Sequence, residues 1–561
     1  MLAVFSAAFG NQVAAAEEAA PNANPAKKEL YLPKRPSRSR GDNDYNDPNS
    51  EFCFKRMVQG DNVAIFWSKE YGSDPMTNPD PNKTFDVNNM LSECERFYKA
   101  YVDDLKLVVK GKSVTDKYKL IVFVIGGPGG TAYGGGDGDI GTLSTPATRV
   151  HKKPYGVLAH EMIHCFQFMS RADGAPGGGV NGEMAAQYGL WQVLPDWLTF
   201  ENYHLVAFMN QTHLAFGHSD NMYHSAQVLE YWSFKHGQDF YGNMLRSTEQ
   251  GDAVTVYKKM YNLNQEQFND EMFDACRRFI TWDMPRIEKV AHQYANQHHT
   301  DFNDVNDGWY RIAKTKCPQN YGYNGIKLKV PAEGTIVSLN FKGLAGTEGF
   351  STLNVDKAGW RYGFLASLKD GSRVYGDVGK DKEGKLTFKV PENSEYLWLV
   401  VMGAPTEHPS GSGGRGSFGG GRGGAGASIA RQVAAMSELS LNADQVSKLN
   451  ALPIPDANIA NAVTSAQTLL TSEVMAGDEA KIKEAVEGVV AATEKNSLSQ
   501  AAEYKKIKDI LTEAQYKQLT ASLTSPRGGR GSPAGGSSQE QWPYQIKLTG
   551  TTLDDSVIEK P

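Results

Sequence analysis

The chain has 561 residues, of which 40% are hydrophobic and 22% charged, and its formal net charge is −6. This length predicts two to four domains, and the composition is that of a globular protein with enough apolar residues for more than one core. The small net charge argues against a dedicated nucleic-acid-binding protein, which usually carries a strong basic bias.

The first residues resemble a secretory signal peptide, although a positively charged start is missing. An apolar stretch, Leu2–Phe9, is followed by the small residues Ala14–Ala16, in the order of a hydrophobic region and a cleavage site. We therefore expect a signal peptide over residues 1–16 and an exported protein of the periplasm, the cell envelope or the extracellular space. No run of about 20 apolar residues follows, so no membrane insertion is expected.

Residues 17–50 are rich in proline, asparagine and charge, which is typical of a linker. The folded sequence then begins with a strand pattern over residues 62–68, an amphipathic helix over 87–105 and a buried-strand pattern over 119–125. This order predicts a small α/β lobe. The chain also has five cysteines in no CxxC arrangement, so an exported protein would allow one or two disulfides and leave at least one thiol over.

A glycine-rich stretch over residues 126–141 follows the second predicted strand. It lacks the G-K-[ST] ending of a P-loop and does not open a helix as the dinucleotide fingerprint does, so nucleotide binding is not expected. We predict a flexible loop here and an extended edge segment over 142–150.

The stretch AHEMIHCFQF carries an HExxH motif within a largely helical region over residues 155–286. On a helix, His160 and His164 lie on one face and can bind one ion together. Glu161 lies about 100° further around the helix and can take a proton from water at that ion. The pattern therefore predicts a Zn²⁺ site with Glu161 as general base. The alternative is a buried helix with two incidental histidines.

The third ligand decides the class of zinc site. A three-histidine HExxHxxGxxH motif is excluded because Gln167 and Ser170 stand at its glycine and histidine positions. Glu183 follows His164 by 19 residues, after a Gly/Pro stretch that ends the first helix, and it can complete a His₂Glu site. Asp173 is the competing ligand, but an aspartate in such a loop is more often a cap.

Further residues are candidates for supporting roles. Gln187 lies one helical turn after Glu183 and can orient a ligand histidine. An oxyanion stabiliser is also required, and Tyr223 and His224 at the start of a helix are the candidates, with surface capping as the alternative reading. His213 and His218 are weaker candidates.

From Gly325 the hydrophobic period changes to two, with short strands separated by Gly, Asp, Asn and Pro, which predicts a β-sandwich. A helical segment rich in Ala, Lys, Glu and Leu interrupts it between two glycine-rich linkers. Strand pattern resumes at residues 542–550, where YQIKL is expected to complete the sheet left open at WLVVMG. The Arg-Gly runs of the linkers lack interleaved aromatics apart from Phe418, so flexible linkers are favoured over RNA binding.

The motif VLAHEMIHCFQF, then NGEMAAQY, then a helical region and a sandwich, resembles the gluzincin class of zinc metallopeptidases. More narrowly, it is similar to a family of bacterial secreted proteins of unknown function. The resemblance covers roughly residues 51–404 and 542–561. It implies zinc, the ligands His160, His164 and Glu183, and the base Glu161. Many gluzincins have an aspartate four residues after the ligand glutamate, where this chain has Gln187.

The inserted segment resembles the Spy/CpxP periplasmic proteins through two copies of their LTxxQ motif, LTEAQ at Leu511–Gln515 and LNADQ at Leu441–Gln445. Each motif can form a capping box at the start of a helix. The resemblance implies a small α-helical module of the Gram-negative envelope that binds unfolded protein, senses stress or dimerises. A structural spacer is the alternative.

We therefore predict an α+β protein with a zincin-like catalytic domain and a β-sandwich interrupted by an all-α module. The boundaries are 51–320 for the zincin-like domain, 325–408 and 542–561 for the sandwich, 409–428 and 525–541 for the linkers, and 429–524 for the module. The predicted function is an exported zinc metallopeptidase acting on a protein or glycoprotein, with no nucleic-acid partner. The alternatives are a non-catalytic envelope binding protein with a structural or degenerate zinc site, and a zinc amidase or other hydrolase.

Overall fold

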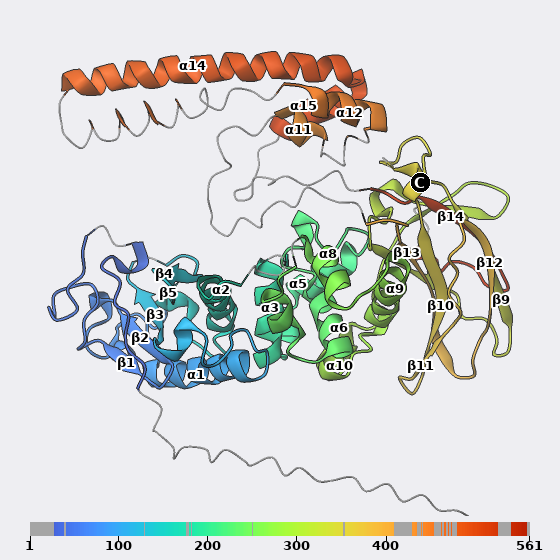
Figure 1. Ribbon diagram of the computed structural model, residues 1–561. Helices are drawn as coiled ribbons and strands as arrows, with labels where there is room; N and C mark the ends of the chain where they lie inside the picture. Colours follow the sequence, from blue (N-terminus) through green and yellow to red (C-terminus); the bar gives the residue numbers. More distant parts are fainter. Residues whose placement is uncertain are drawn as a thin grey trace, which may run out of the picture.

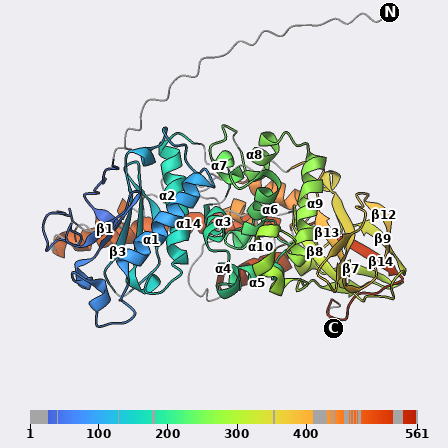
Figure 2. The ribbon, with the colours of Figure 1, turned by 90° about the horizontal axis from the view of Figure 1, so that it is seen from below.

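The computed structural model is mixed α+β, as predicted, and consists of a sheet lobe, a helical lobe, a β-sandwich and a separate helical segment (Figure 1). The first three follow one another along the molecule (Figure 2). The structure describes residues 27–557 except 39–40, 128, 176–178, 181, 250, 352–353, 409–428, 435–438, 440, most of 454–478, and 525–539. The predicted signal peptide, the linker over 409–428 and most of the linker over 525–541 lie outside these residues.

The N-terminal lobe contains a five-stranded sheet in the order β1-β2-β3-β5-β4. The strands are β1 Met57–Gln59, β2 Val63–Trp67, β3 Leu120–Ile125, β4 Tyr133–Asp137 and β5 Ile140–Pro146. β2, β3 and β5 are parallel, while β1 and β4 are antiparallel to their neighbours. The predicted strand, helix and strand of this lobe are all present.

Both faces of this sheet are covered, which explains why β2 and β3 read as continuous apolar runs. Alternate side chains face helices α1, Val87–Asp103, and α2, Gly156–Ala172. On the other face, Phe66 and Phe123 pack against Tyr45 and Phe52. The linker prediction is therefore wrong for the described part of residues 17–50, because scattered apolar residues there cover the second face of the sheet.

The glycine-rich stretch is also not the predicted loop. Strand β4 lies within it and forms the edge of the sheet, while β5 is an interior strand, so the predicted edge segment over 142–150 is corrected. A Cβ atom on Gly134 would lie 1.9 Å from the carbonyl oxygen of Glu161, and one on Gly136 would lie 2.1 Å from the Phe168 ring. Glycine is required because β4 presses directly against α2.

The helical lobe lies in the region over residues 155–286 that the sequence predicts to be largely helical. Its helices are α3 Gly182–Val193, α4 Trp197–Phe200, α5 Tyr203–Asn210, α6 Ala226–His236, α7 Phe240–Leu245, α8 Ala253–Met260, α9 Gln265–Thr281 and α10 Pro285–Ala291. α9 also joins this lobe to the sandwich, since the nearly buried guanidinium of Arg361 bonds Asp270 at 2.7 Å and Glu266 at 2.6 Å.

The β-sandwich has two antiparallel sheets around one apolar core. The four-stranded sheet runs β11 Arg373–Tyr375, β10 Trp360–Leu368, β13 Ser394–Gly403 and β8 Tyr323–Leu328. The five-stranded sheet runs β12 Glu383–Lys389, β9 Ile336–Gly343, β14 Tyr544–Thr549, β7 Trp309–Ile312 and β6 Phe302–Asp304.

Two sequence expectations about the sandwich need correction. It starts at β6, so its first two strands precede the predicted boundary at residue 325. β14 does return to the sandwich after the inserted segment, but it pairs with β9 and β7 and not with β13, which lies in the opposite sheet. Periodicity shows that a strand has one buried face but carries no information on which of two facing sheets it joins.

The inserted segment contains α11 Ile429–Ala434, α12 Ala443–Ala451, α14 Glu479–Ile510 and α15 Glu513–Thr524. Both predicted capping boxes are present, at Asn442 with Gln445 and at Thr512 with Gln515. The two glutamines also bond each other, since Gln445 Nε2 lies 2.8 Å from Gln515 Oε1. The repeated motif therefore joins the starts of two helices in addition to capping each one.

All five cysteines are buried and none forms a disulfide, so the disulfides allowed by the sequence are not formed. Among the residues that the structure describes, no helix combines the length and the apolar character needed to cross a membrane.

Candidate metal centre

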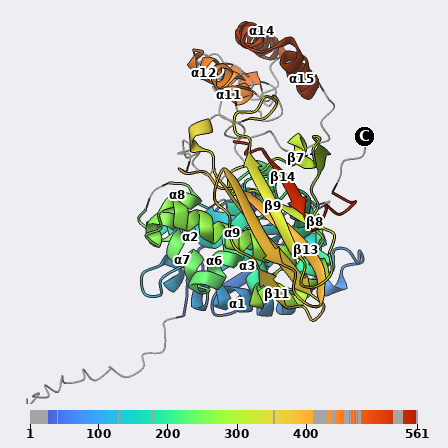
Figure 3. The same ribbon diagram turned by 90° about the vertical axis from the view of Figure 1, so that its right-hand side faces the viewer.

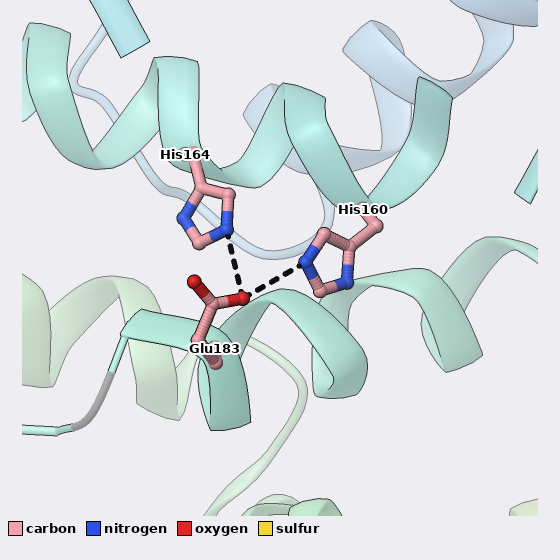
Figure 4. Close-up of side chains that lie close together, drawn as sticks. All are labelled: His160, His164 and Glu183. Carbon is pink, nitrogen blue, oxygen red and sulfur yellow. Dashed lines mark hydrogen bonds and ion pairs between the residues drawn. The ribbon is translucent and has the colours of Figure 1, made fainter. Parts of the chain in front are cut away.

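Helix α2 carries the HExxH motif at the boundary between the sheet lobe and the helical lobe. Its apolar positions Leu158, Met162 and Ile163 are fully buried, as the sequence predicts. This packing fixes the rotation of the helix about its axis. His160 and His164 therefore project from the same side, towards α3 (Figure 4).

Helix α3 brings Glu183 to the histidines because small residues let the two helices approach closely. A Cβ atom on Gly189 would lie only 2.3 Å from the Ile163 side chain, and the neighbouring Ala185 and Ala186 are fully buried. Glu183 lies in the first turn of α3, after the loop that reverses the chain.

The three side chains converge on one point (Figure 4). Glu183 Oε2 lies 3.1 Å from His160 Nε2 and 3.3 Å from His164 Nε2. The ligand atoms of all three residues lie within 4.8 Å of one another, and this is the one such group of His, Cys, Asp and Glu found among the described residues. The three side chains are 10–28% exposed, so solvent can reach them.

These distances fit a tetrahedral zinc site. With bonds of about 2.05 Å and angles of about 109°, two ligand atoms of zinc are about 3.3 Å apart. The two histidine–glutamate distances are already near this value. Two imidazoles and one carboxylate are also the ligand set of catalytic zinc sites that leave the fourth position open.

Glu183 and His164 stabilise each other's charged forms. Burial alone would raise the pKa of Glu183, but hydrogen bonds from His160 and His164 outweigh it and hold that pKa well below its usual range. Burial lowers the pKa of His164, but the bond to Glu183 more than compensates and leaves it raised. A carboxylate that stays ionised is ready to bind a cation. A cation that binds His164 must displace the proton from its imidazole.

Gln167 orients His164 and was not identified from the sequence as a site residue. Its Oε1 atom lies 3.0 Å from His164 Nδ1, which places a proton on Nδ1 and directs Nε2 to the point of convergence. Gln167 Nε2 donates to the carbonyl oxygen of Gly182 at 3.2 Å and lies 3.1 Å from the Tyr241 hydroxyl. Gln167 thus links a histidine of α2 to the start of α3. Its signal in the sequence is the spacing, since it follows His164 by three residues on the same helix.

Gln187 does not have the predicted role. Its Nε2 atom lies 3.1 Å from His204 Nε2, so it bonds a histidine of α5 and not one of α2. Gln187 lies on the same side of α3 as Glu183, as its spacing predicts. His160 and His164 approach α3 only at its first turn, however, so Gln187, one turn later, does not bond them.

Glu161 lies beside the histidines and faces strand β4. Its Oε2 atom accepts a hydrogen bond of 2.6 Å from the main-chain N–H of Gly134. The predicted base is therefore held at the open edge of the sheet, next to the three converging side chains.

Tyr223 lies over the site, whereas His224 is one step further away. The Tyr223 ring is nearly parallel to that of His160, with centroids 6.4 Å apart. Burial, with the nearby carboxylate of Glu183, raises the pKa of Tyr223, so its hydroxyl stays protonated. His224 Nδ1 instead lies 2.9 Å from His204 Nδ1.

His204 is a second residue that the sequence reasoning missed. Burial lowers its pKa to about 3, with a smaller contribution from His224, so it is neutral at pH 7. Its ring lies 6.0 Å from that of Tyr223 and 3.9 Å from that of Tyr203. No motif marks it, because it reaches the site from α5 through the packing of the helical lobe.

The weaker sequence candidates have structural roles. Asp173 Oδ1 accepts a hydrogen bond of 3.0 Å from the N–H of Val114, so it is Glu183 and not Asp173 that joins the histidines. His218 Nδ1 accepts from the N–H of Asp220 at 3.1 Å. His213 is partly buried, and its carbonyl oxygen accepts a hydrogen bond of 2.8 Å from the N–H of Gln319.

The sheet lobe, the helical lobe and the part of the sandwich before the insertion correspond to one known family. A family model described as "Family of unknown function (DUF6055)" matches residues 22–414, which is more than half of the chain. A search of the curated proteins finds no match. The match includes the whole candidate metal centre and ends where the inserted helical segment is about to begin, and the chain is a member of the DUF6055 family.

Proposed function

We propose that this chain is an exported zinc-dependent metallopeptidase. The observation that supports this proposal best is the convergence of His160, His164 and Glu183 with Glu161 beside them. Two histidines, a carboxylate ligand and an adjacent glutamate base are the parts that hydrolysis of a peptide bond by activated water requires. Export is supported by the apolar and small residues of the first 16 positions.

The residues have distinct tasks in this proposal. Zinc, when bound, polarises the scissile carbonyl and lowers the pKa of water towards neutrality. Glu161 takes the proton from the attacking water and passes it to the leaving amine. Tyr223, whose pKa is raised, keeps a hydroxyl proton with which to stabilise the developing oxyanion.

Strand β4 supports a peptide substrate over a small molecule. The hairpin from β4 to β5 closes with the pair Asp137 and Ile140 around two turn residues, so this pair is hydrogen-bonded. The bonding alternates along the ladder, so Gly134 and Gly136 turn their N–H and C=O groups to the open edge, where the N–H of Gly134 donates to Glu161. An extended peptide can add at the remaining groups of this edge as a further strand, directly beside Glu161.

The test compares the parent protein with Glu161→Gln, which keeps the size of the side chain but removes the base. Both proteins should bind one zinc ion. Cleavage of casein or unfolded protein should fall by about 10²–10⁴-fold in the variant. Glu333→Gln, at an exposed site on the sandwich, is the matched control and should leave cleavage unchanged.

Two results would contradict the proposal. One is a protein that binds no zinc under conditions where it is folded. The other is zinc bound equally by the parent and the Glu161→Gln variant with no hydrolysis of any protein or peptide by either, which would favour a binding protein with a structural zinc site.

A further inference from the structure

The five-stranded sheet of the sandwich has one face towards the sandwich core and one face away from it. Along β9 the burial alternates, with Val337, Leu339 and Phe341 buried while Ser338 and Asn340 are partly exposed. β12 and β14 alternate in the same way. The inner residues fill the sandwich core, and the outer residues form the opposite, polar side of the sheet, whose strands β9 and β14 are labelled in Figure 3.

The strand register places these outer residues in rows across the sheet. Lys385 of β12 pairs with Asn340 of β9, which pairs with Lys547 of β14, which pairs with Trp309 of β7. At about 4.8 Å between strands, this row extends about 14 Å. A parallel row contains Lys342, Gln545 and Arg311. The rows therefore combine cations, amides and one indole along a straight line.

The face is basic although the chain as a whole has a net charge of −6. Its cations are Lys342, Lys385, Lys389, Lys547 and Arg311, and the carboxylate in the same rows is Glu383. The pair between Lys342 and Glu383, 3.1 Å apart, is 44% and 65% exposed and so contributes little to stability. The Nε atom of Arg311 is buried without a hydrogen-bond partner.

We propose that this face, named here the basic sheet face and made of the outer residues of β7, β9, β12 and β14, binds an acidic polysaccharide. The lysines and Arg311 match carboxylate or sulfate groups. Asn340 and Gln545 offer both donors and acceptors, which suits sugar hydroxyls. The indole of Trp309 provides an apolar surface at the end of the row, on which a sugar ring can lie.

The same residues fit a nucleic acid or a membrane less well. A protein that binds single-stranded nucleic acid stacks successive bases on several aromatic rings, and Trp309 is the one aromatic side chain in the described outer rows. A membrane-binding face combines cations with exposed apolar side chains that enter the lipid. Ile336, which is 63% exposed, is such a side chain here, and it lies at the end of β9, away from the central row.

The experiment uses the full chain and measures its dissociation constants for four probes at several salt concentrations. Polygalacturonate carries carboxylates, heparin carries sulfates, dextran is a neutral polysaccharide, and oligo-dT is a nucleic acid of comparable charge. Vesicles containing phosphatidylglycerol test the membrane. We expect binding to polygalacturonate or heparin that weakens with salt, and no binding to dextran.

Lys385→Ala with Lys547→Ala removes two cations from the central row and should weaken polysaccharide binding about tenfold at low salt. The control, Lys55→Ala with Lys99→Ala, makes the same charge change at exposed sites on the sheet lobe and should leave the affinity within about twofold. Asn340→Ala should weaken binding without altering its salt dependence, since it removes no charge.

Three results would overturn the inference. These are no binding of either acidic polysaccharide, equal loss in the two lysine double variants, and tighter binding to oligo-dT or to vesicles than to both acidic polysaccharides. None of these measurements uses the metal centre, so failure here leaves the proposed peptidase activity standing, and the reverse also holds.

Discussion

Replacing Gln167 by methionine tests the claim that this residue orients His164. Methionine has a similar length and shape but cannot bond the imidazole. Gln167 is only 2% exposed and makes three contacts, to His164 at 3.0 Å, to Gly182 at 3.2 Å and to Tyr241 at 3.1 Å. The variant therefore releases a ligand histidine and leaves polar groups buried without partners.

The expected effects differ for stability and for metal affinity. Each lost hydrogen bond costs about 1 kcal/mol, so the free energy of unfolding without metal should fall by about 2–4 kcal/mol. Loss of a partner that orients a ligand histidine typically weakens metal affinity by about 10–100-fold. This change corresponds to about 1.4–2.7 kcal/mol of binding free energy.

Gln187→Met is the matched control, because Gln187 is also a buried glutamine, 5% exposed, that bonds a histidine, but that histidine is His204. Zinc affinity is measured by competition with a chromogenic chelator, and stability by urea unfolding with chelator present. The Gln187 variant should keep its zinc affinity within about threefold even if it loses stability. Equal zinc affinity in the Gln167 variant and the parent, or equal losses in the two variants, would refute the role of Gln167.

Two further predictions follow from crowding and from burial. Gly134→Ala should lower the free energy of unfolding by about 1–3 kcal/mol, because its Cβ meets the backbone of Glu161, whereas Gly135→Ala has open space and should not; equal thermal midpoints would contradict this. Burial lowers the pKa of His298 to about 3 in the folded protein, from an ordinary value of 6.5. Below pH 6.5 the unfolded chain therefore binds a proton at His298 that the folded protein does not. The free energy of unfolding then falls by about 1.4 kcal/mol for each pH unit. His298→Gln should reduce the slope of unfolding free energy between pH 6 and 4 by about that amount, as measured by urea unfolding, and an unchanged slope would contradict the assignment.

The cluster of His160, His164 and Glu183 could be located from the sequence because its parts are governed by local rules. The spacing of His160 and His164 depends only on helix geometry, and the apolar residues beside them fix which side is buried. Glu183 required a further step, the prediction of a chain reversal, for which the Gly/Pro stretch gave a clear signal. The structure brings these three side chains together.

The parts that sequence reasoning misplaced depend on contacts between distant segments. Glycines are typical of loops, and nothing local shows that Gly134 is a strand residue pressed against α2. Tyr45 packs on Phe66, which lies 21 positions further along the chain. The sequence also pointed to Gln187 as the glutamine that orients a candidate ligand histidine, whereas the structure gives this contact to Gln167. Both glutamines lie in the predicted helical region, and only the packing of α2 on α3 determines which of them contacts His164.

The same contacts explain how the candidate site is assembled around helix α2. β4 packs against α2 and holds Glu161 through Gly134, while α3 packs against α2 and supplies Glu183. The carboxylate base is therefore a residue of α2 held by β4, whereas the carboxylate ligand belongs to α3. If β4 or α3 shifted relative to α2, only one carboxylate would be displaced. Changes at Gly134 should therefore affect catalysis more than zinc affinity, and changes at Gln167 should affect zinc affinity directly.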